Sequence, residues 1–291
     1  MHPAPSVIIF TVLSGIGFGL FVWLGFDIPS TSGMTAFYYY FLAYGFSVGG
    51  LIASTFHLGN PKNAYKSFSQ WRTSWLSREA WLALITLSIY SILAINLIFL
   101  ENHLAWLGII AALIAVMTVF STAMIYAQLK TIPRWNHFLV PVYFLVLALT
   151  GGALLTNQVK VTVFLLLSSL AIQILLWLVG DKRFSSTGTT METATGLGHI
   201  GKVRLFEPPH TGNNYLLQEM VYVIGRKHAY KIRLICLLFL GITPIVILLL
   251  FTHSIFNAVF AFISHLIGAI MSRWLFFAEA EHVIGLYYGK R

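Results

Sequence analysis

The sequence predicts an all-α, polytopic membrane protein, a bundle of eight transmembrane helices that forms a single integral membrane domain over residues 1–291. Hydrophobic residues make up 58% of the chain, charged residues only 9%, and the mean hydropathy is +0.81. Soluble domains carry about 25% charged residues, so the composition excludes an ordinary soluble protein. Apolar stretches of about 20 residues, the length that crosses the hydrocarbon core as a helix, cover nearly the whole chain. A transmembrane β-barrel would show alternating stretches of about ten residues instead.

Eight apolar segments are long enough to form these helices. They are Ser6–Phe26, Met34–Phe56, Ala80–Leu100, Ala105–Gln128, Phe138–Thr156, Val161–Gly180, Leu234–His253 and Phe256–Phe277. The first segment has no Lys or Arg before it and no small-residue cleavage site after a short apolar core. We therefore expect a retained helix and not a signal peptide.

Basic residues fall almost entirely on one side of this predicted topology. With the N-terminus inside, both tails and the even-numbered connections hold 16 of the 18 Lys and Arg residues. The opposite side has only Lys160, and Arg273 lies within the last segment. The positive-inside rule then places both termini and the His57–Glu79 connection in the cytoplasm, with the protein in the inner membrane. Topology and anionic lipids explain the net charge of +9, so we do not infer nucleic-acid binding.

The longest connection, Asp181–Arg233, resembles a soluble insertion and is expected on the cytoplasmic side. Its run Gly196–Gly201 matches the GxGxxG pattern of dinucleotide sites, but no strand is predicted before it, so we interpret the match as accidental. The apolar residues of Asn213–Arg233 have helical spacing. They predict an amphipathic helix, which either lies on the lipid surface or docks a partner protein.

Cys236 is the only cysteine, and it lies in an apolar segment. The chain can therefore hold no disulfide of its own and no cysteine-ligated iron–sulfur cluster. A redox role would need metal centres in another protein of a complex.

Several polar residues lie where the predicted helices meet the cytoplasmic side. His57 ends the second segment, Glu79 precedes the third and Tyr126 ends the fourth, which places the three at one depth. Ionisable groups are costly at this depth, so they are candidates for function. Each also has a structural explanation; the helix dipole, for example, favours Glu79 at a helix start. Together with tryptophans such as Trp71, they predict a pocket for an amphipathic ring compound with a lipid tail.

These segments resemble the membrane anchor of the dimethyl sulfoxide reductase family. The resemblance rests on the motif Ala53–Pro61, on its spacing to Leu76–Glu79 and on Ile125–Trp135, and the eight-segment layout extends it over nearly the whole chain. It implies a complex with a molybdopterin subunit and with an iron–sulfur subunit that holds [4Fe–4S] clusters, and electron exchange with membrane quinone, either ubiquinone or menaquinone. In that family the His of the His-Leu-Gly motif and the Glu that opens the next helix are associated with quinol binding. These residues map onto His57 and Glu79.

Two features are more similar to the anchor of the cytoplasmic sulfite dehydrogenase branch of this family. The charge count places the motif side in the cytoplasm, whereas the respiratory reductase works on the outer face. The long loop, with Pro208–Thr211 and Gly225–Ala229, also looks more like that branch. The resemblance then implies that electrons flow from sulfite into quinone. A quinol-oxidising anchor of a dimethyl sulfoxide reductase-type complex is the alternative.

In either direction a bound quinone must exchange protons. An imidazole such as that of His57 titrates near neutral pH, and burial tunes a carboxyl group such as that of Glu79 toward the same range. Arg78 or Arg273 can stabilise negative charge on the quinone ring. With Tyr126 and Trp71, these residues form the predicted quinone-binding and proton-transfer site.

Two other classes of membrane protein remain as alternatives. A transporter would use helix breaks, and Gly151–Gly152 and Gly241–Pro244 are candidates for such breaks. A cytochrome b-like protein would use histidines as haem ligands, and His253, His265 and His282 lie in or near the last two segments.

Overall fold

The computed structural model describes residues 1–207, 212, 214–221, 228–251 and 254–288, and within them every regular element is a helix. The longer helices are α1 (Pro5–Gly25), α2 (Gly33–Thr55), α3 (Trp75–Phe99), α4 (Ala105–Ala127), α5 (Leu139–Leu155), α6 (Val159–Ser186), α9 (Ala229–Leu237), α10 (Thr243–Leu250) and α11 (Ile255–Ala278). The shorter elements are η1 (Pro61–Phe68), α7 (Met191–Thr195), α8 (Tyr215–Glu219), η3 (Leu238–Ile242) and η4 (Val283–Tyr288). The predicted all-α class is confirmed for this part of the chain.

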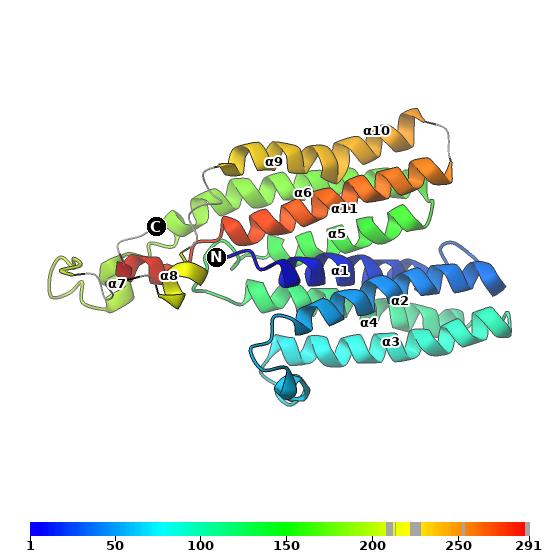
Figure 1. The fold of residues 1–291 in the computed structure, drawn as a ribbon, viewed down its shortest axis with the longest axis horizontal. Helices are drawn as coiled ribbons and strands as arrows, with labels where there is room; N and C mark the ends of the chain where they lie inside the picture. The colour runs from blue at the N-terminus through cyan, green and yellow to red at the C-terminus, as the bar shows by residue number, and fades with distance from the viewer. Residues whose placement is uncertain (208–211, 213, 222–227, 252–253, 289–291) are drawn as a thin grey trace.

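Seven of the described helices are long and apolar enough to cross a membrane. They are α1, α2, α3, α4, α6, α11 and the composite helix Ala229–Leu250, in which α9, the π-helical turn η3 and α10 follow one another. The remaining predicted segment forms α5, a shorter apolar helix of 17 residues that packs beside α1 and α6. Figure 1 shows these helices running roughly side by side in one bundle. The chain is a multi-pass membrane protein.

Helix α1 is the centre of the bundle. It contacts α2, α4, α5 and α11, and residues on every face of it are buried, which fits a helix that is apolar all round. Small residues let its neighbours approach closely. A Cβ atom on Gly19 would lie 1.8 Å from the carbonyl oxygen of Ala148, and one on Gly152 would lie 2.4 Å from the carbonyl carbon of Gly19. Gly151–Gly152 therefore forms a close helix contact within a continuous α5. It does not form the helix break that a transporter site would use.

Several helix boundaries differ from those expected. Helix α3 begins at Trp75, five residues before the expected start, so Glu79 lies one turn inside the helix. Helix α6 continues to Ser186, past the expected end at Gly180. The bend expected at Gly241–Pro244 takes the form of the π-helical turn η3, and Pro244 stands in the first turn of α10, directly after it.

The amino end of the chain and the elements η1, α7, α8 and η4 lie at one end of the bundle (Figure 1). The amino group of Met1 donates a hydrogen bond to the carbonyl oxygen of Ala280 at 2.8 Å, and the His2 N–H donates to the carbonyl oxygen of Glu219 at 2.7 Å. We call this end of the bundle the basic end, because the connections located there carry most of the Lys and Arg residues.

The connection after α6 differs in part from its prediction. The described part of Asn213–Arg233 contains two separate helices, α8 and the beginning of α9, instead of one, because the chain turns at Met220. Residues 222–227 and the motif Pro208–Thr211 lie outside the described residues. Docking of a partner protein on this connection stays a prediction.

Candidate functional site

Glu79 is a buried carboxyl group inside the bundle, with its side chain directed at α4. The residue is 4% exposed, and the Thr122 hydroxyl donates a hydrogen bond to its Oε1 atom at 2.5 Å. No basic side chain forms an ion pair with Glu79 in the described part of the chain. A carboxylate in an apolar helix layer is expensive unless it is paired, so a carboxyl group left unpaired there is suited to taking up a proton.

Tyr126 lies one turn beyond Thr122 on α4 and is 8% exposed. Its ring packs edge-on against Trp135, Phe276 and Phe277, with ring centroids 5.4, 5.6 and 5.5 Å away. These aromatic contacts join α4 to the end of α11.

Arg273 of α11 is the most deeply buried Lys or Arg side chain among the described residues, with 2% exposure. Its guanidinium carbon lies 3.4 Å from the ring centroid of Phe144 and 4.7 Å from that of Tyr143, in cation–π contact. Its Nε and Nη1 atoms have no hydrogen-bond partner among the described residues. The aromatic rings of α5 therefore offset part of the free energy of burying this charge, and two of its donor atoms have no described partner.

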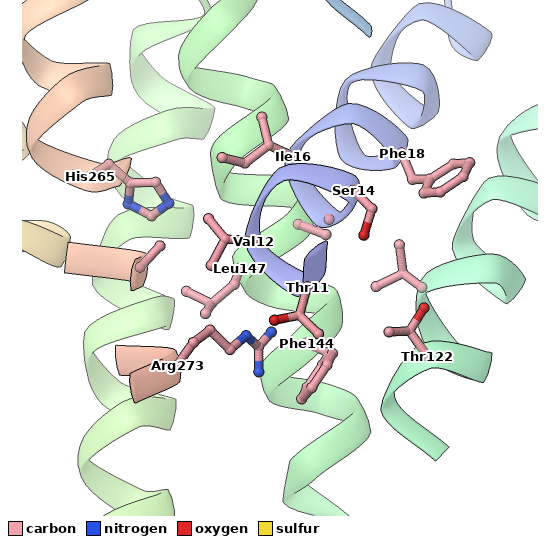
Figure 2. Close-up of a pocket in the computed structure, with 14 residues that line it drawn as sticks. Thr11, Val12, Ser14, Ile16, Phe18, Thr122, Phe144, Leu147, His265 and Arg273 are labelled. Atoms are coloured by element: carbon pink, nitrogen blue, oxygen red, sulfur yellow. The ribbon is translucent and has the colours of Figure 1, made fainter. Parts of the chain in front are cut away.

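A small cavity lies between α1, α4, α5 and α11, and Arg273, Thr122, Thr11 and His265 contribute to its wall (Figure 2). Its volume is about 20 Å³, which holds about one water molecule. The cavity is too small for a quinone ring. It does bring the free donors of Arg273 to the same space as Thr122, the hydrogen-bond partner of Glu79.

His265 lies in the middle of α11 and is fully buried. Its Nδ1 atom is 2.7 Å from the carbonyl oxygen of Leu240 in η3, and its Nε2 atom has no partner among the described residues. This contact ties α11 to the π-helical turn. Of the other histidines considered as haem ligands, His253 lies outside the described residues and His282 lies beyond the end of α11.

Of the other predicted site residues, His57 and Trp71 lie on the exposed connection between α2 and α3, and Arg78 lies in the first turn of α3. All three are at the basic end. His57 follows the end of α2, and its side chain is exposed and makes no hydrogen bond with the described residues. Arg78 donates hydrogen bonds to the carbonyl oxygens of Trp71 at 3.0 Å and of Arg72 at 2.7 Å, and its guanidinium covers the ring of Trp75. Trp71 itself is 55% exposed. The structure thus places Glu79, Tyr126 and Arg273 inside the bundle, and His57, Trp71 and Arg78 at its rim.

A model of the DMSO reductase anchor subunit (DmsC) family matches residues 1–289. The chain belongs to this family. It is also 29% identical, over 326 aligned positions that cover 99% of both chains, to a sulfite dehydrogenase subunit of Allochromatium vinosum. No solved structure gives a significant match. The predicted resemblance is confirmed, and the chain is a membrane anchor subunit of an oxidoreductase complex.

A second buried charge cluster, which the sequence analysis did not identify, lies elsewhere in the anchor. Glu279, at the end of α11, is 6% exposed and accepts hydrogen bonds from Arg134 at 2.9 Å and Arg233 at 2.7 Å. Both arginines also bind Asp181 of α6, at 2.5 and 2.6 Å. We call these four residues the arginine–carboxylate network. Its members lie far apart in the sequence and share no local motif that could have identified the network.

Proposed function

We propose that this anchor binds quinone at the basic end of the bundle, near α2, α3 and α4, and passes electrons between an iron–sulfur subunit and the membrane quinone pool. The observation that carries the proposal is the buried Glu79, whose only hydrogen-bond partner among the described residues is the Thr122 hydroxyl. A structural carboxylate in a membrane would be expected to have a cation as its partner. A carboxyl group that must gain and lose a proton would not be expected to have such a cation as its partner.

The proposed partners are an iron–sulfur subunit and a molybdopterin catalytic subunit, docked at the basic end. Family membership supports such a complex, and the name of the sulfite dehydrogenase relative supports sulfite as the electron source. The lone Cys236 is buried, so clusters that deliver electrons would have to lie in the partner. The positive-inside rule supports a cytoplasmic position for the basic end, for both termini and for the partners, with α5 as the eighth crossing of the inner membrane.

The quinone supplies the two-electron redox chemistry, and the anchor residues supply protons and orientation. Thr122 occupies Oε1 of Glu79, so Oε2 is the oxygen at which a proton can be held and transferred. His57, at the exposed rim, has no competing side-chain hydrogen bond among the described residues and can exchange protons with the cytoplasm. Arg78 donates hydrogen bonds to the backbone carbonyl groups of Trp71 and Arg72. These bonds hold its guanidinium in place at the rim of the proposed site.

The experiment compares quinone-coupled turnover with dye-coupled turnover in the purified complex. Glu79→Gln and His57→Ala are each expected to lower quinone-coupled turnover by about 10²-fold, the usual contribution of a positioned acid–base group. Turnover with a dye that takes electrons directly from the iron–sulfur subunit should not change. Glu101→Gln is the matched control, because Glu101 is an exposed carboxyl group just beyond the opposite end of α3. Parental quinone turnover in assembled Glu79→Gln and His57→Ala complexes would rule out this site.

A further inference from the structure

An open groove runs between α4 and α5 near the basic end, and it is distinct from the cavity beside Arg273. Its volume is about 730 Å³, and we call it the α4–α5 groove. Most of its wall is apolar and is formed by Phe120, Met124, Pro141, Val142 and Leu145. Phe138, at its polar end, is 71% exposed, so lipid covers this surface in a membrane.

Arg183 of α6 closes the polar end of the groove. Its Nη2 atom donates a hydrogen bond of 3.3 Å to the carbonyl oxygen of Asn136, whereas its Nε atom is buried without a partner among the described residues. Arg183 forms no ion pair with a described residue, and the described wall of the groove contains no acidic side chain. An unpaired cation at the end of an apolar groove favours an anion as its partner.

His137 provides a second donor at the same end of the groove. The N–H of Leu139 donates to its Nδ1 atom at 3.2 Å, which assigns the proton of the neutral imidazole to Nε2. Burial and, to a smaller degree, the charge on Arg183 lower the pKa of the His137 imidazole, so the neutral form is favoured at neutral pH. The groove therefore combines a cation, a neutral N–H donor and an apolar track.

We propose that the α4–α5 groove binds an anionic phospholipid, with its phosphate at Arg183 and His137 and an acyl chain along the apolar wall. A phosphate diester matches the unpaired charge of the Arg183 guanidinium, and basic pockets between membrane helices are suited to such headgroups. A quinone ring is neutral and would leave the charge of Arg183 unpaired. The bound lipid would join α4, α5 and α6 at the end of the bundle where α4 carries Thr122. This proposal does not depend on quinone binding.

The test measures retention of lipids of defined composition by the purified full-length chain with its copurifying subunits. Native mass spectrometry would compare phosphatidylglycerol with phosphatidylcholine of the same acyl chains. Arg183→Gln is expected to lower phosphatidylglycerol affinity about five-fold, the effect of one basic residue near an anionic headgroup. Lys182→Gln, the same charge change at an exposed neighbouring position of α6, should retain parental affinity.

Further arms separate the acyl chain from the headgroup and the lipid from other ligands. Val142→Trp, at a 37% exposed position of the apolar wall, fills the groove and should lower lipid retention while keeping Arg183. Inorganic phosphate should not displace the lipid, because it lacks the acyl chain. Equal affinities of Arg183→Gln and Lys182→Gln, displacement of the lipid by phosphate alone, or its displacement by a short-chain quinone would each overturn the proposal.

Discussion

Two buried glutamates, Glu79 in α3 and Glu279 after α11, lie near the same end of the bundle with similar burial but very different partners. Their exposed fractions are 4% and 6%. Glu279 accepts hydrogen bonds from two arginines, which both also bind Asp181. Glu79 accepts one hydrogen bond, from a hydroxyl group. The two glutamates therefore differ in the charge of their partners and not in their burial.

The difference follows from the cost of placing a charge in a medium of low dielectric constant. A carboxylate with two guanidinium partners is compensated in its charged form, and these ion pairs hold helices together. A carboxyl group with only a hydroxyl partner has no such compensation, and its charged and neutral forms are closer in free energy. The arginine–carboxylate network thus joins α6, α9 and α11, whereas the role that we propose for Glu79 requires its carboxyl group to change protonation state.

The largest expected effect is on the stability of the arginine–carboxylate network. Glu279→Gln leaves two partly buried guanidinium groups with only Asp181 between them. We expect the free energy of unfolding to fall by about 3 kcal/mol, near the lower limit for breaking a buried ion pair because Asp181 still binds both arginines. Thermal unfolding of the purified complex, compared with Glu101→Gln, measures this loss.

A double-mutant cycle tests whether that loss comes from the network. Arg233→Gln combined with Glu279→Gln removes a charge of each sign, so the combined loss should be smaller than the sum of the two single losses. Strict additivity would show that the two side chains act independently, and the contrast between Glu79 and Glu279 would fail.

A smaller effect is expected from Thr122→Val, which removes the hydroxyl partner of Glu79 at almost constant volume. The carboxyl group would keep its burial but lose the hydrogen bond that orients it, and quinone-coupled turnover should fall about ten-fold. Thr122→Ser should restore the rate, since it restores the hydroxyl group. Thr118→Val removes a buried hydroxyl one turn away that bonds Thr86 and does not bond Glu79. An equal loss from Thr118→Val would indicate general damage to the α3–α4 contact.

The positions of the helices were predictable from the sequence, because apolar stretches of about 20 residues carry a strong signal. The start of α3 was predicted too late, since Arg78 and Glu79 were taken to mark its boundary. Arg78 instead lies within the helix and bonds back to the preceding connection, while Glu79 is satisfied by α4. A hydropathy window cannot detect a polar residue that a neighbouring helix compensates.

The site was predictable only in part. The motif residues His57 and Glu79 were identified by spacing and resemblance, but the structure places one at the exposed rim and the other inside the bundle. The arginine–carboxylate network was not identified, because its members come from four segments that are up to 145 residues apart in sequence. Their pairing depends on the packing of α6, α9 and α11 together, which no local pattern encodes.

The smallest expected effect is that of Glu79→Gln on stability, and it sharpens the contrast with Glu279→Gln. A glutamine at position 79 has nearly the same volume, keeps an oxygen that can accept the Thr122 hydrogen bond, and removes no ion-pair partner found among the described residues. It also removes a buried group that is costly in its charged form, which offsets the cost of placing the amide N–H₂ group. The free energy of unfolding should therefore change by less than about 1 kcal/mol. The same thermal unfolding assay that reports the loss in Glu279→Gln measures it. A loss as large as that of Glu279→Gln would mean that Glu79 is a structural carboxylate whose charge the fold requires.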